Sequence, residues 1–350
     1  MKNYLKLETA LQRLPKVTLG FYPTPLQKLE KLSERYGVNI YVKRDDFSGM
    51  SVFGGNKIRK LEYLMGDALR LGCDTVFTYG ATQSNHAMQT ATAARKCGLL
   101  PILYLAAIVE PDKECVRANL LLDTILGAEI HIVPAEDGSL ANASARAAVL
   151  AKRQMERLER DGHKCYDVPL GGASVIGTCG FLEGFMELEK QLEAIGQKAD
   201  YLFTATGTGG TLAGVTAGKR ALDSDVNIVG ITVGEKPEDY PQHIADLANR
   251  ALQKIGLSGD VTLDDFSIDR GYFAPGYEQP NEEANAAIRE LARTEGILAD
   301  PVYSGKGFSG MLGHIRAGKV KAGSTVVFLH TGGTTALFAE SEIIGSLAEM

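Results

Sequence analysis

The sequence has no apolar stretch of the length that a membrane-spanning helix needs, about 18 residues. Its first segment, MKNYLKLETALQRLPKV, has scattered charges and no apolar core, so we expect no signal peptide. The formal net charge is −6, whereas a protein that binds nucleic acid usually needs a concentrated basic surface. These absences predict that the protein has no membrane and no nucleic-acid partner.

Cysteine and histidine are too scattered to suggest a metal site. The histidines show no HxxxH or HxH pairing, so no metal is expected. The cysteines are odd in number and form no CxxC motif, which argues against zinc and against a disulfide framework; they are Cys73, Cys97, Cys115, Cys165 and Cys179. Reduced thiols of this kind predict a cytoplasmic protein.

The chain also lacks low-complexity tracts, Ser/Pro-rich linkers and repeats of fixed period. Its 350 residues, 45% hydrophobic and 23% charged, suffice for two domains or for one large α/β unit. If there are two domains, we expect the chain to cross directly between them rather than through a tether.

Apolar, β-branched runs alternate with segments of helical periodicity, which predicts an α/β fold with mostly parallel sheets and helices on both faces. The expected strands are Asn39–Lys43, Thr75–Tyr79, Pro101–Leu105, Glu129–Val133, Tyr201–Ala205, Asn227–Thr232 and Thr325–Leu329. The expected helices are Asn56–Leu71, Gln83–Cys97, Arg117–Leu126, Asn142–Asp161, Thr178–Ile195 and Asn281–Glu295.

Glycine-bearing turns follow three of these strands, at Tyr79–Ala81, Thr206–Gly210 and Thr331–Gly333. Ligands bind at the carboxyl ends of strands in open α/β sheets. We therefore expect the three turns to line one cleft.

The segment ATGTGGTLAG, from Ala205 to Gly214, has the composition of a phosphate-binding turn. Glycine lets the backbone approach an anion closely, and N–H groups at a helix start form a nest for phosphate. The segment lacks the lysine of a P-loop and the GxGxxG spacing of a dinucleotide fold, which disfavours a nicotinamide oxidoreductase. It predicts a site for a monophosphate or for the phosphate of a small cofactor; a plain strand–helix turn is the alternative.

The segment YGATQSNHAMQTA, from Tyr79 to Ala91, places five polar residues, 82 to 86, at an expected helix start. Exposed N–H groups there favour a carboxylate or a ring oxygen. A plain N-cap by Thr82 or Ser84, with His86 in a structural role, is the alternative.

In GGNKIRK, residues 54–60, Lys57 stands where a Gly-Gly turn enters a helix, with Arg59 and Lys60 nearby. A partly desolvated lysine among other cations has a lowered pKa and becomes a nucleophile toward carbonyl groups. A solvated basic turn is the alternative interpretation.

These three motifs are followed by YFAPGY (Tyr272 to Tyr277), DPVYSGKGFSGM (Asp300 to Met311) and HTGGTTALF (His330 to Phe338). In this order they resemble the D-cysteine desulfhydrase and 1-aminocyclopropane-1-carboxylate deaminase group of pyridoxal-phosphate enzymes, which has the tryptophan synthase β-subunit fold. The likeness begins at PTPL, Pro23 to Leu26, and covers nearly the whole chain.

The resemblance implies a pyridoxal 5′-phosphate cofactor. Lys57 would form the Schiff base with it and move the proton at Cα of the substrate. Asn85 would contact the ring hydroxyl. The phosphate would be held by Lys60 together with Gly207, Thr208, Gly209, Gly210 and Thr211.

The resemblance further implies a small amino-acid substrate. Its carboxylate would be bound by Ser84, Asn85 and His86, and Ser84 would also move protons. Tyr272 and Tyr303 match the two tyrosines that face the substrate in this group. A small domain, about residues 62–170, would be inserted into a larger one made of residues 1–61 and 171–350, with the cofactor between them and a homodimer as the usual state.

Two positions bear on the reaction. In the cyclopropane deaminases DPVY is followed by Glu and the position of Thr331 is usually Leu, whereas this chain has Ser304 and Thr331. The hydroxyl pair resembles the desulfhydrase branch, so we expect Thr331 at the ring nitrogen of the cofactor with Ser304 beside it. Neutral hydroxyls make a weaker electron sink than a carboxylate does, and a weak sink suffices to eliminate a good leaving group.

The expected reaction is therefore β-elimination, with D-cysteine as the first candidate substrate and pyruvate, ammonia and hydrogen sulfide as products. Phe53 and Met88 depart from the usual desulfhydrase pattern near the substrate side. L-Cysteate, which would lose sulfite, is the alternative substrate, and deamination of the cyclopropane amino acid is a further one. A relative that only binds ligand is disfavoured because Lys57 and Ser84 are retained.

Overall fold

The computed structural model describes residues 3–49, 54–112, 114–279 and 281–339. Phe53, singled out above, lies outside the described residues. None of the helices within these ranges is long and apolar enough to cross a bilayer.

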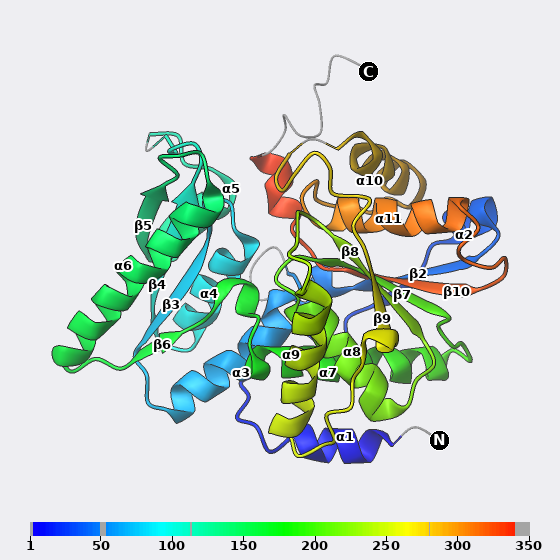
Figure 1. Cartoon of the computed structure of the whole chain (residues 1–350), viewed down its shortest axis with the longest axis horizontal. Helices are drawn as coiled ribbons and strands as arrows, with labels where there is room; N and C mark the ends of the chain where they lie inside the picture. Colours follow the sequence, from blue (N-terminus) through cyan, green and yellow to red (C-terminus); the bar gives the residue numbers. More distant parts are fainter. Residues whose placement is uncertain (1–2, 50–53, 113, 280, 340–350) are drawn as a thin grey trace.

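The described strands form two sheets, which lie side by side in Figure 1. The larger sheet has six strands in the order β1-β2-β10-β7-β8-β9, and only β1 and β2 pair antiparallel. Its strands are β1 (Leu26–Lys28), β2 (Asn39–Arg44), β7 (Tyr201–Thr206), β8 (Asn227–Thr232), β9 (Phe266–Asp269) and β10 (Thr325–His330).

The smaller sheet is wholly parallel, in the order β5-β4-β3-β6. Its strands are β3 (Thr75–Ala81), β4 (Leu100–Ala107), β5 (Glu129–Pro134) and β6 (Cys165–Asp167). All four come from one continuous stretch of chain, which lies inside the expected small domain; the boundaries of that domain stay a prediction.

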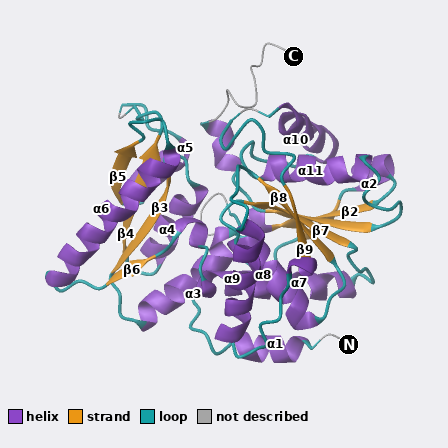
Figure 2. Cartoon of the chain, viewed as in Figure 1, coloured by secondary structure: helices purple, strands orange, loops and turns teal. Residues whose placement is uncertain are grey.

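Helices cover both faces of each sheet (Figure 2), which confirms the expected fold class. The helices are α1 (Tyr4–Leu11), α2 (Glu30–Tyr36), α3 (Lys57–Arg70), α4 (Asn85–Lys96), α5 (Ala118–Ile125), α6 (Leu140–Arg160), α7 (Val175–Ala194), α8 (Gly210–Leu222), α9 (Tyr240–Lys254), α10 (Glu282–Glu295) and α11 (Ser304–Arg316). Short 3-10 turns lie at η1 (Asp45–Phe47), η2 (Leu170–Gly172), η3 (Leu263–Asp265) and η4 (Thr334–Phe338).

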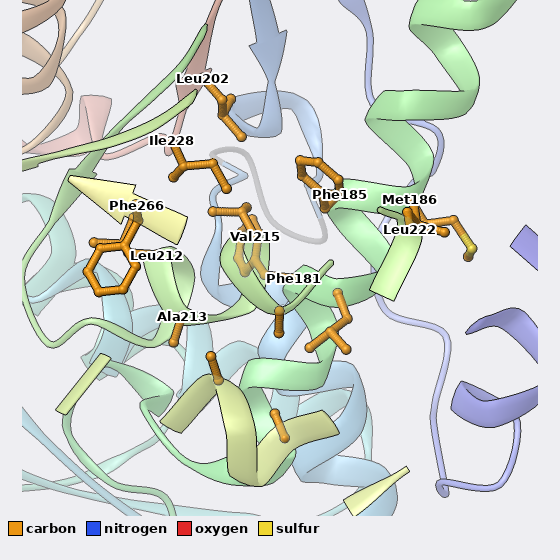
Figure 3. Packing of buried hydrophobic residues seen from close by; sticks show 14 of the residues in the cluster. Phe181, Phe185, Met186, Leu202, Leu212, Ala213, Val215, Leu222, Ile228 and Phe266 are labelled. Atoms are coloured by element: carbon orange, nitrogen blue, oxygen red, sulfur yellow. The ribbon is translucent and has the colours of Figure 1, made fainter. Parts of the chain in front are cut away.

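The large sheet is buried on both faces because its central strands are apolar on both sides. On β10, Val327 and Leu329 join one core cluster, and Val326 and Phe328 join the other. Figure 3 shows the first cluster, in which residues of α7 and α8 gather against strands β7, β8 and β9; those labelled are Phe181, Phe185, Met186, Leu202, Leu212, Ala213, Val215, Leu222, Ile228 and Phe266.

A buried ion-pair network fixes the start of α3. The Arg59 guanidinium contacts Asp45 and Glu187, in each case with 2.8 Å between nitrogen and oxygen. Helix α7 passes so close that a Cβ on Gly180 would lie 2.2 Å from the Arg59 carbonyl oxygen. This close approach holds the first turn of α3, which begins at Lys57, against the large sheet's helical layer.

Candidate active site

The carboxyl ends of β3, β7 and β10 open onto one cavity of about 460 Å³. The turns that follow these strands line it through Gly80 and Ala81, Thr206 to Gly209, and Thr331 with Gly332. The three glycine-bearing turns therefore share one cleft, as predicted. Of the predicted site residues, eleven line this cavity: Lys57, Lys60, Ser84, Asn85, His86, Gly207, Thr208, Gly209, Thr211, Tyr303 and Thr331.

Lys57 is the first residue of α3, and its Nζ donates to Asn56 Oδ1 at 2.9 Å. Burial lowers the pKa of this lysine to about 8, although the negative charge of Asp300 opposes the shift. A lysine with such a pKa is in part an unprotonated amine at neutral pH, which is the nucleophilic form. Asn56 also donates from Nδ2 to Thr211 Oγ1 at 2.9 Å, so it links Lys57 to the glycine turn.

The turn after β7 has the geometry of an anion nest. Gly209 adopts φ +91°, and a Cβ there would lie 2.2 Å from Ile244 Cδ1, so only glycine fits. Gly210, the first residue of α8, is not itself part of the cavity wall, but a Cβ on it would lie 3.1 Å from Lys60 Nζ. The lysine amine therefore lies against the N-terminus of α8, where backbone N–H groups favour an anion.

Lys60 is buried, and its Nζ donates to the Gly171 carbonyl oxygen at 3.1 Å. Burial lowers its pKa well below the usual value, and the positive charge of Lys57 adds to this shift. No carboxylate among the described residues forms an ion pair with this amine. An anion bound at the nest would supply the missing countercharge.

Ser84 and Asn85 begin α4 and present donors to the cavity. Ser84 is the N-cap, and its Oγ accepts from the Ala87 backbone N–H at 3.2 Å, which leaves its hydroxyl proton available. Asn85 Oδ1 accepts from Asn119 Nδ2 and from Thr335 Oγ1, both at 2.8 Å. These two bonds fix the orientation of the amide, so its NH₂ group is the part that remains to donate.

His86 lines the cavity but is held on its other side by the smaller sheet. Its Nε2 lies 2.9 Å from Thr78 Oγ1 on β3. Burial lowers its pKa well below the usual value, with further contributions from the charges of Lys57 and Lys60. The ring is therefore neutral at physiological pH. Met88, on the same helix, is buried and does not line the cavity.

The structure corrects the choice of one tyrosine. Tyr277, rather than Tyr272, lines the cavity and shares a hydrogen bond between hydroxyl groups with Tyr303. Tyr272 packs beside α11: a Cβ on Gly313 would lie 2.1 Å from its hydroxyl oxygen, and its ring centroid is 6.4 Å from that of His314. Tyr272 and Tyr277 are the first and last residues of the motif YFAPGY, and Tyr277 is the one that lines the cavity.

Ser304 also differs from the expectation. Its Oγ donates to Asp300 Oδ1 at 2.5 Å and accepts from the Asp300 backbone N–H at 2.8 Å. The side chain is fully buried and is not part of the cavity wall. Its hydroxyl is thus used to close the turn before α11, and it is not free for a cofactor ring.

Thr331 does line the cavity, directly after β10. Its carbonyl oxygen accepts from the Asn56 N–H at 3.0 Å, which holds the residue beside Lys57. Its hydroxyl makes no hydrogen bond within the described part of the chain. Of the two hydroxyl residues predicted at the ring nitrogen, this is the one available.

Comparisons with known proteins identify the cofactor class. A family model described as "Pyridoxal-phosphate dependent enzyme" matches residues 17–332. The chain belongs to this family. It is 38% identical to a protein of Pyrococcus abyssi whose name proposes 1-aminocyclopropane-1-carboxylate deaminase activity, over 96% of this chain and 97% of that one. It is 37% identical to a D-cysteine desulfhydrase of Serratia proteamaculans, over 96% and 98%.

Solved structures agree with this assignment. A crystal structure described as an ACC deaminase homologue superposes with a TM-score of 0.86 at 38% identity, and the match covers 97% of this chain and 98% of that one. Threonine deaminase isoform 2 from Solanum lycopersicum has a TM-score of 0.67 at 18% identity, covering 99% and 94%, which shows the shared fold alone.

The residues of this cavity fit pyridoxal phosphate. The buried amine of Lys60 and the nest at Gly209 would hold the phosphate, and Lys57, with its lowered pKa, would hold the aldehyde carbon. Asn85 would donate to the ring hydroxyl, and Thr331 would meet the ring nitrogen. Asn56 was missed although it stands in the motif GGNKIRK, because the motif does not show that its side chain bridges two other site residues.

Proposed function

We propose that this pyridoxal-phosphate dependent enzyme is a carbon–sulfur lyase that acts on a small amino acid by β-elimination, with D-cysteine as the first substrate. The products would be pyruvate, ammonia and hydrogen sulfide. Support comes from relatives named D-cysteine desulfhydrase at 37% and 38% identity over nearly the full length. Relatives named for the cyclopropane amino acid are equally similar, so the cavity has to separate the two reactions.

One observation carries the proposal: the inner wall of the cavity presents hydroxyl groups and no free carboxylate. Among the described residues that line it, Glu235 is the only acid, and its side chain is exposed to solvent. Asp300 does not line the cavity, and both of its carboxylate oxygens accept hydrogen bonds from the protein. Oδ1 accepts from the Ser304 N–H and hydroxyl, and Oδ2 accepts from the N–H groups of Val302 and Tyr303.

A neutral hydroxyl at the ring nitrogen favours a reaction that needs only a short-lived carbanion. When bound, pyridoxal phosphate supplies the electron sink for that carbanion. Loss of a good sulfur leaving group from Cβ requires little stabilisation, whereas opening a cyclopropane ring requires more. Thr331 therefore favours the elimination.

The remaining roles follow from the positions of the side chains. The α4 N-terminus, with the hydroxyl of Ser84, would bind the substrate carboxylate, because N–H groups and the helix dipole favour an anion there. Lys57 would take the proton from Cα of the substrate as a general base. Its pKa of about 8 suits it to exchange a proton near neutral pH.

Tyr277 and Tyr303 would assist the departing sulfur. Burial raises the pKa of both phenols, so each keeps its proton at neutral pH. One hydroxyl donates to the other, and the proton of the second remains to donate to the substrate. Lys57 Nζ lies 6.0 Å from the centroid of the Tyr303 ring, which places the pair beside the reacting amine. A donor at this point would stabilise the negative charge that develops on sulfur.

The proposal is tested by measuring products from four substrates: D-cysteine, L-cysteine, L-cysteate and 1-aminocyclopropane-1-carboxylate. We expect sulfide and pyruvate in equal amounts from D-cysteine. Release of 2-oxobutanoate from the cyclopropane amino acid, or of sulfite from L-cysteate without sulfide from D-cysteine, would contradict it. Lys57→Ala serves as the control, and its full turnover would refute the assigned role of this lysine.

A further inference from the structure

Lys236 is a third lysine on the cavity wall, and neither the sequence motifs nor the reaction assigns it a role. It lies on the loop between β8 and α9 and lines the cavity together with Val233 and Glu235. Its side chain is partly buried, yet its ammonium forms no ion pair with any carboxylate of the described residues. Its ammonium group lies over the ring of Tyr240, with 5.7 Å between Nζ and the ring centroid.

The loop that carries Lys236 is held in place by several contacts. Arg270 donates to the carbonyl oxygens of Lys236 and Pro237, at 3.2 and 2.9 Å. A Cβ on Gly234 would lie 3.1 Å from Tyr277 Cβ, so the loop packs directly against the tyrosine pair. The Tyr240 hydroxyl donates to the Gly207 carbonyl oxygen at 2.9 Å, which ties the start of α9 to the glycine turn.

An unpaired, partly desolvated cation is costly unless an anion joins it. Burial lowers the pKa of Lys236, and no neighbouring carboxylate offsets this effect. The cofactor already engages the other two lysines of the cavity: Lys60 would meet the phosphate, and Lys57 would meet the aldehyde carbon. The uncompensated positive charge of Lys236 is therefore available to the substrate, on a loop that lines the cavity and packs against Tyr277.

We propose that Lys236 forms an anion subsite on the wall of the active cavity, which binds a sulfonate or similar fixed negative charge on the β-substituent of the substrate. This inference rests on the proposed function, because it assumes a small amino acid with a sulfur leaving group. It extends that function to cysteate, whose β-carbon carries such a charge.

The proposed elimination of sulfite from cysteate needs no reactant other than water. The Cα proton passes to Lys57, the Cβ–S bond breaks, and its electron pair leaves with sulfur as sulfite. Water then replaces nitrogen in the remaining three-carbon fragment, which gives pyruvate and ammonia. Because the leaving group is an anion before and after the bond breaks, a fixed cation is useful throughout.

Binding of two unreactive acids to the holoenzyme tests the subsite without any turnover. The probes are 3-sulfopropanoate, which has a carboxylate and a sulfonate, and butanoate, which has only the carboxylate. Calorimetry gives the Kd of each. We expect wild type to prefer 3-sulfopropanoate, and Lys236→Gln to weaken that probe about tenfold while leaving butanoate unchanged.

Two further variants separate charge from loop structure. Lys236→Arg keeps the positive charge and should bind 3-sulfopropanoate within about threefold of wild type. Glu235→Gln alters the neighbouring residue of the same loop but removes a negative charge, so it should not weaken this probe. Equal weakening by Glu235→Gln and Lys236→Gln would mean that the loop, not the charge, is responsible.

Other outcomes would overturn the proposal. Equal binding of the two probes by wild type would mean that no anion subsite exists. A large rise in the Kd for pyridoxal phosphate in Lys236→Gln, with the ratio of the two probes unchanged, would assign the lysine to the cofactor phosphate instead. Sulfide release from D-cysteine by wild type is measured separately, so failure of the proposed function and failure of the subsite are distinguishable.

Discussion

At the scale of single residues, the two lysines of α3 differ in burial and in partners: Lys57 is half-buried and Lys60 is buried. Lys57 donates to the Asn56 amide oxygen and is affected by the charge of Asp300, whereas Lys60 donates to a backbone carbonyl oxygen and lies near the ring of Phe181. Loss of solvent lowers the pKa of both amines, and that of Lys57 falls to about 8. One lysine is suited to react with a carbonyl group, and the other to bind an anion.

The lowered pKa of Lys57 predicts how the apoenzyme takes up its cofactor. Only the unprotonated amine attacks the aldehyde, so the rate should rise with pH and level off above about pH 8. Stopped-flow absorbance of pyridoxal phosphate mixed with apoenzyme measures this rate. A rate that keeps rising to pH 10 would show an ordinary lysine at this position.

The two tyrosines of YFAPGY predict opposite outcomes for the same substitution. Tyr277→Phe removes the partner of Tyr303 and a donor from the cavity, so kcat/KM for D-cysteine should fall about tenfold to hundredfold. Tyr272→Phe is the matched control, since this residue packs beside α11 outside the cavity, and its kcat/KM should stay within about twofold. A larger loss with Tyr272→Phe would restore the assignment made from the sequence.

Most of the site residues predicted from the sequence line the cavity, but the sequence did not show how their hydroxyl groups are used. A motif gives the residue type, whereas the partner of Ser304 depends on the turn that brings Asp300 within 2.5 Å of it. In the same way, YFAPGY offers two tyrosines, and the bend between them decides which one enters the site. Lys236 was missed because its loop carries no recognisable pattern.

At the scale of secondary-structure elements, the site is made where helices begin. The first turns of α3, α4 and α8 carry Lys57, Asn85 and Gly210, and all three helices follow a turn at the cavity. The free N–H groups of a helix start favour negative charge. Three such starts around one cavity suit a ligand that carries both a phosphate and a carboxylate.

Two glycines of one turn predict different tolerance for a methyl group. Gly209→Ala puts a Cβ into Ile244 at a positive φ, so it should lower the free energy of unfolding by about 1 to 3 kcal/mol and weaken pyridoxal phosphate binding. In Gly207→Ala the Cβ meets its nearest neighbours at 3.6 and 3.7 Å, which is ordinary contact, so stability should be retained. Thermal unfolding and cofactor titration measure both. Equal stability of the two variants would show that the turn is not constrained as described.

The longer strands were easier to predict than the short ones. The apolar runs of β2, β7, β8 and β10 and the periodic α6 were found with ends within a few residues of those observed. Strands β1, β6 and β9 were not, because three or four residues show no period of their own and gain their place from neighbouring strands.

At the scale of the whole molecule, stability should depend on pH through a carboxyl group remote from the lysines. Asp123, on α5, is buried, and neither of its carboxylate oxygens has a hydrogen-bond partner. Burial raises its pKa from 3.8 to about 8. Between these values the folded protein keeps a proton that the unfolded chain releases, so this group lowers stability as pH rises from about 4 to 8.

Asp123→Asn removes that dependence. The free energy of unfolding should fall less steeply with pH in this variant, by up to about 1.4 kcal/mol per pH unit. Chemical denaturation at several pH values between 4 and 8 measures the slope. The exposed Asp264→Asn is the control and should leave the slope as in wild type. An unchanged slope in Asp123→Asn would mean that the carboxyl group is ionised in the folded protein.

The predicted site residues come from separate lengths of chain, which correspond to the two sheets. The strands from β3 to β6, with Ser84 and Asn85 between them, form one uninterrupted segment. The reactive lysine, the glycine turn, both cavity tyrosines and Lys236 all lie outside that segment. If Ser84 and Asn85 bind the substrate carboxylate as proposed, a single recombination event that exchanged this segment between relatives would transfer carboxylate binding without changing the residues proposed to contact the substrate side chain. Enzymes of this fold could therefore gain new substrates by exchange of this whole segment as well as by point mutation.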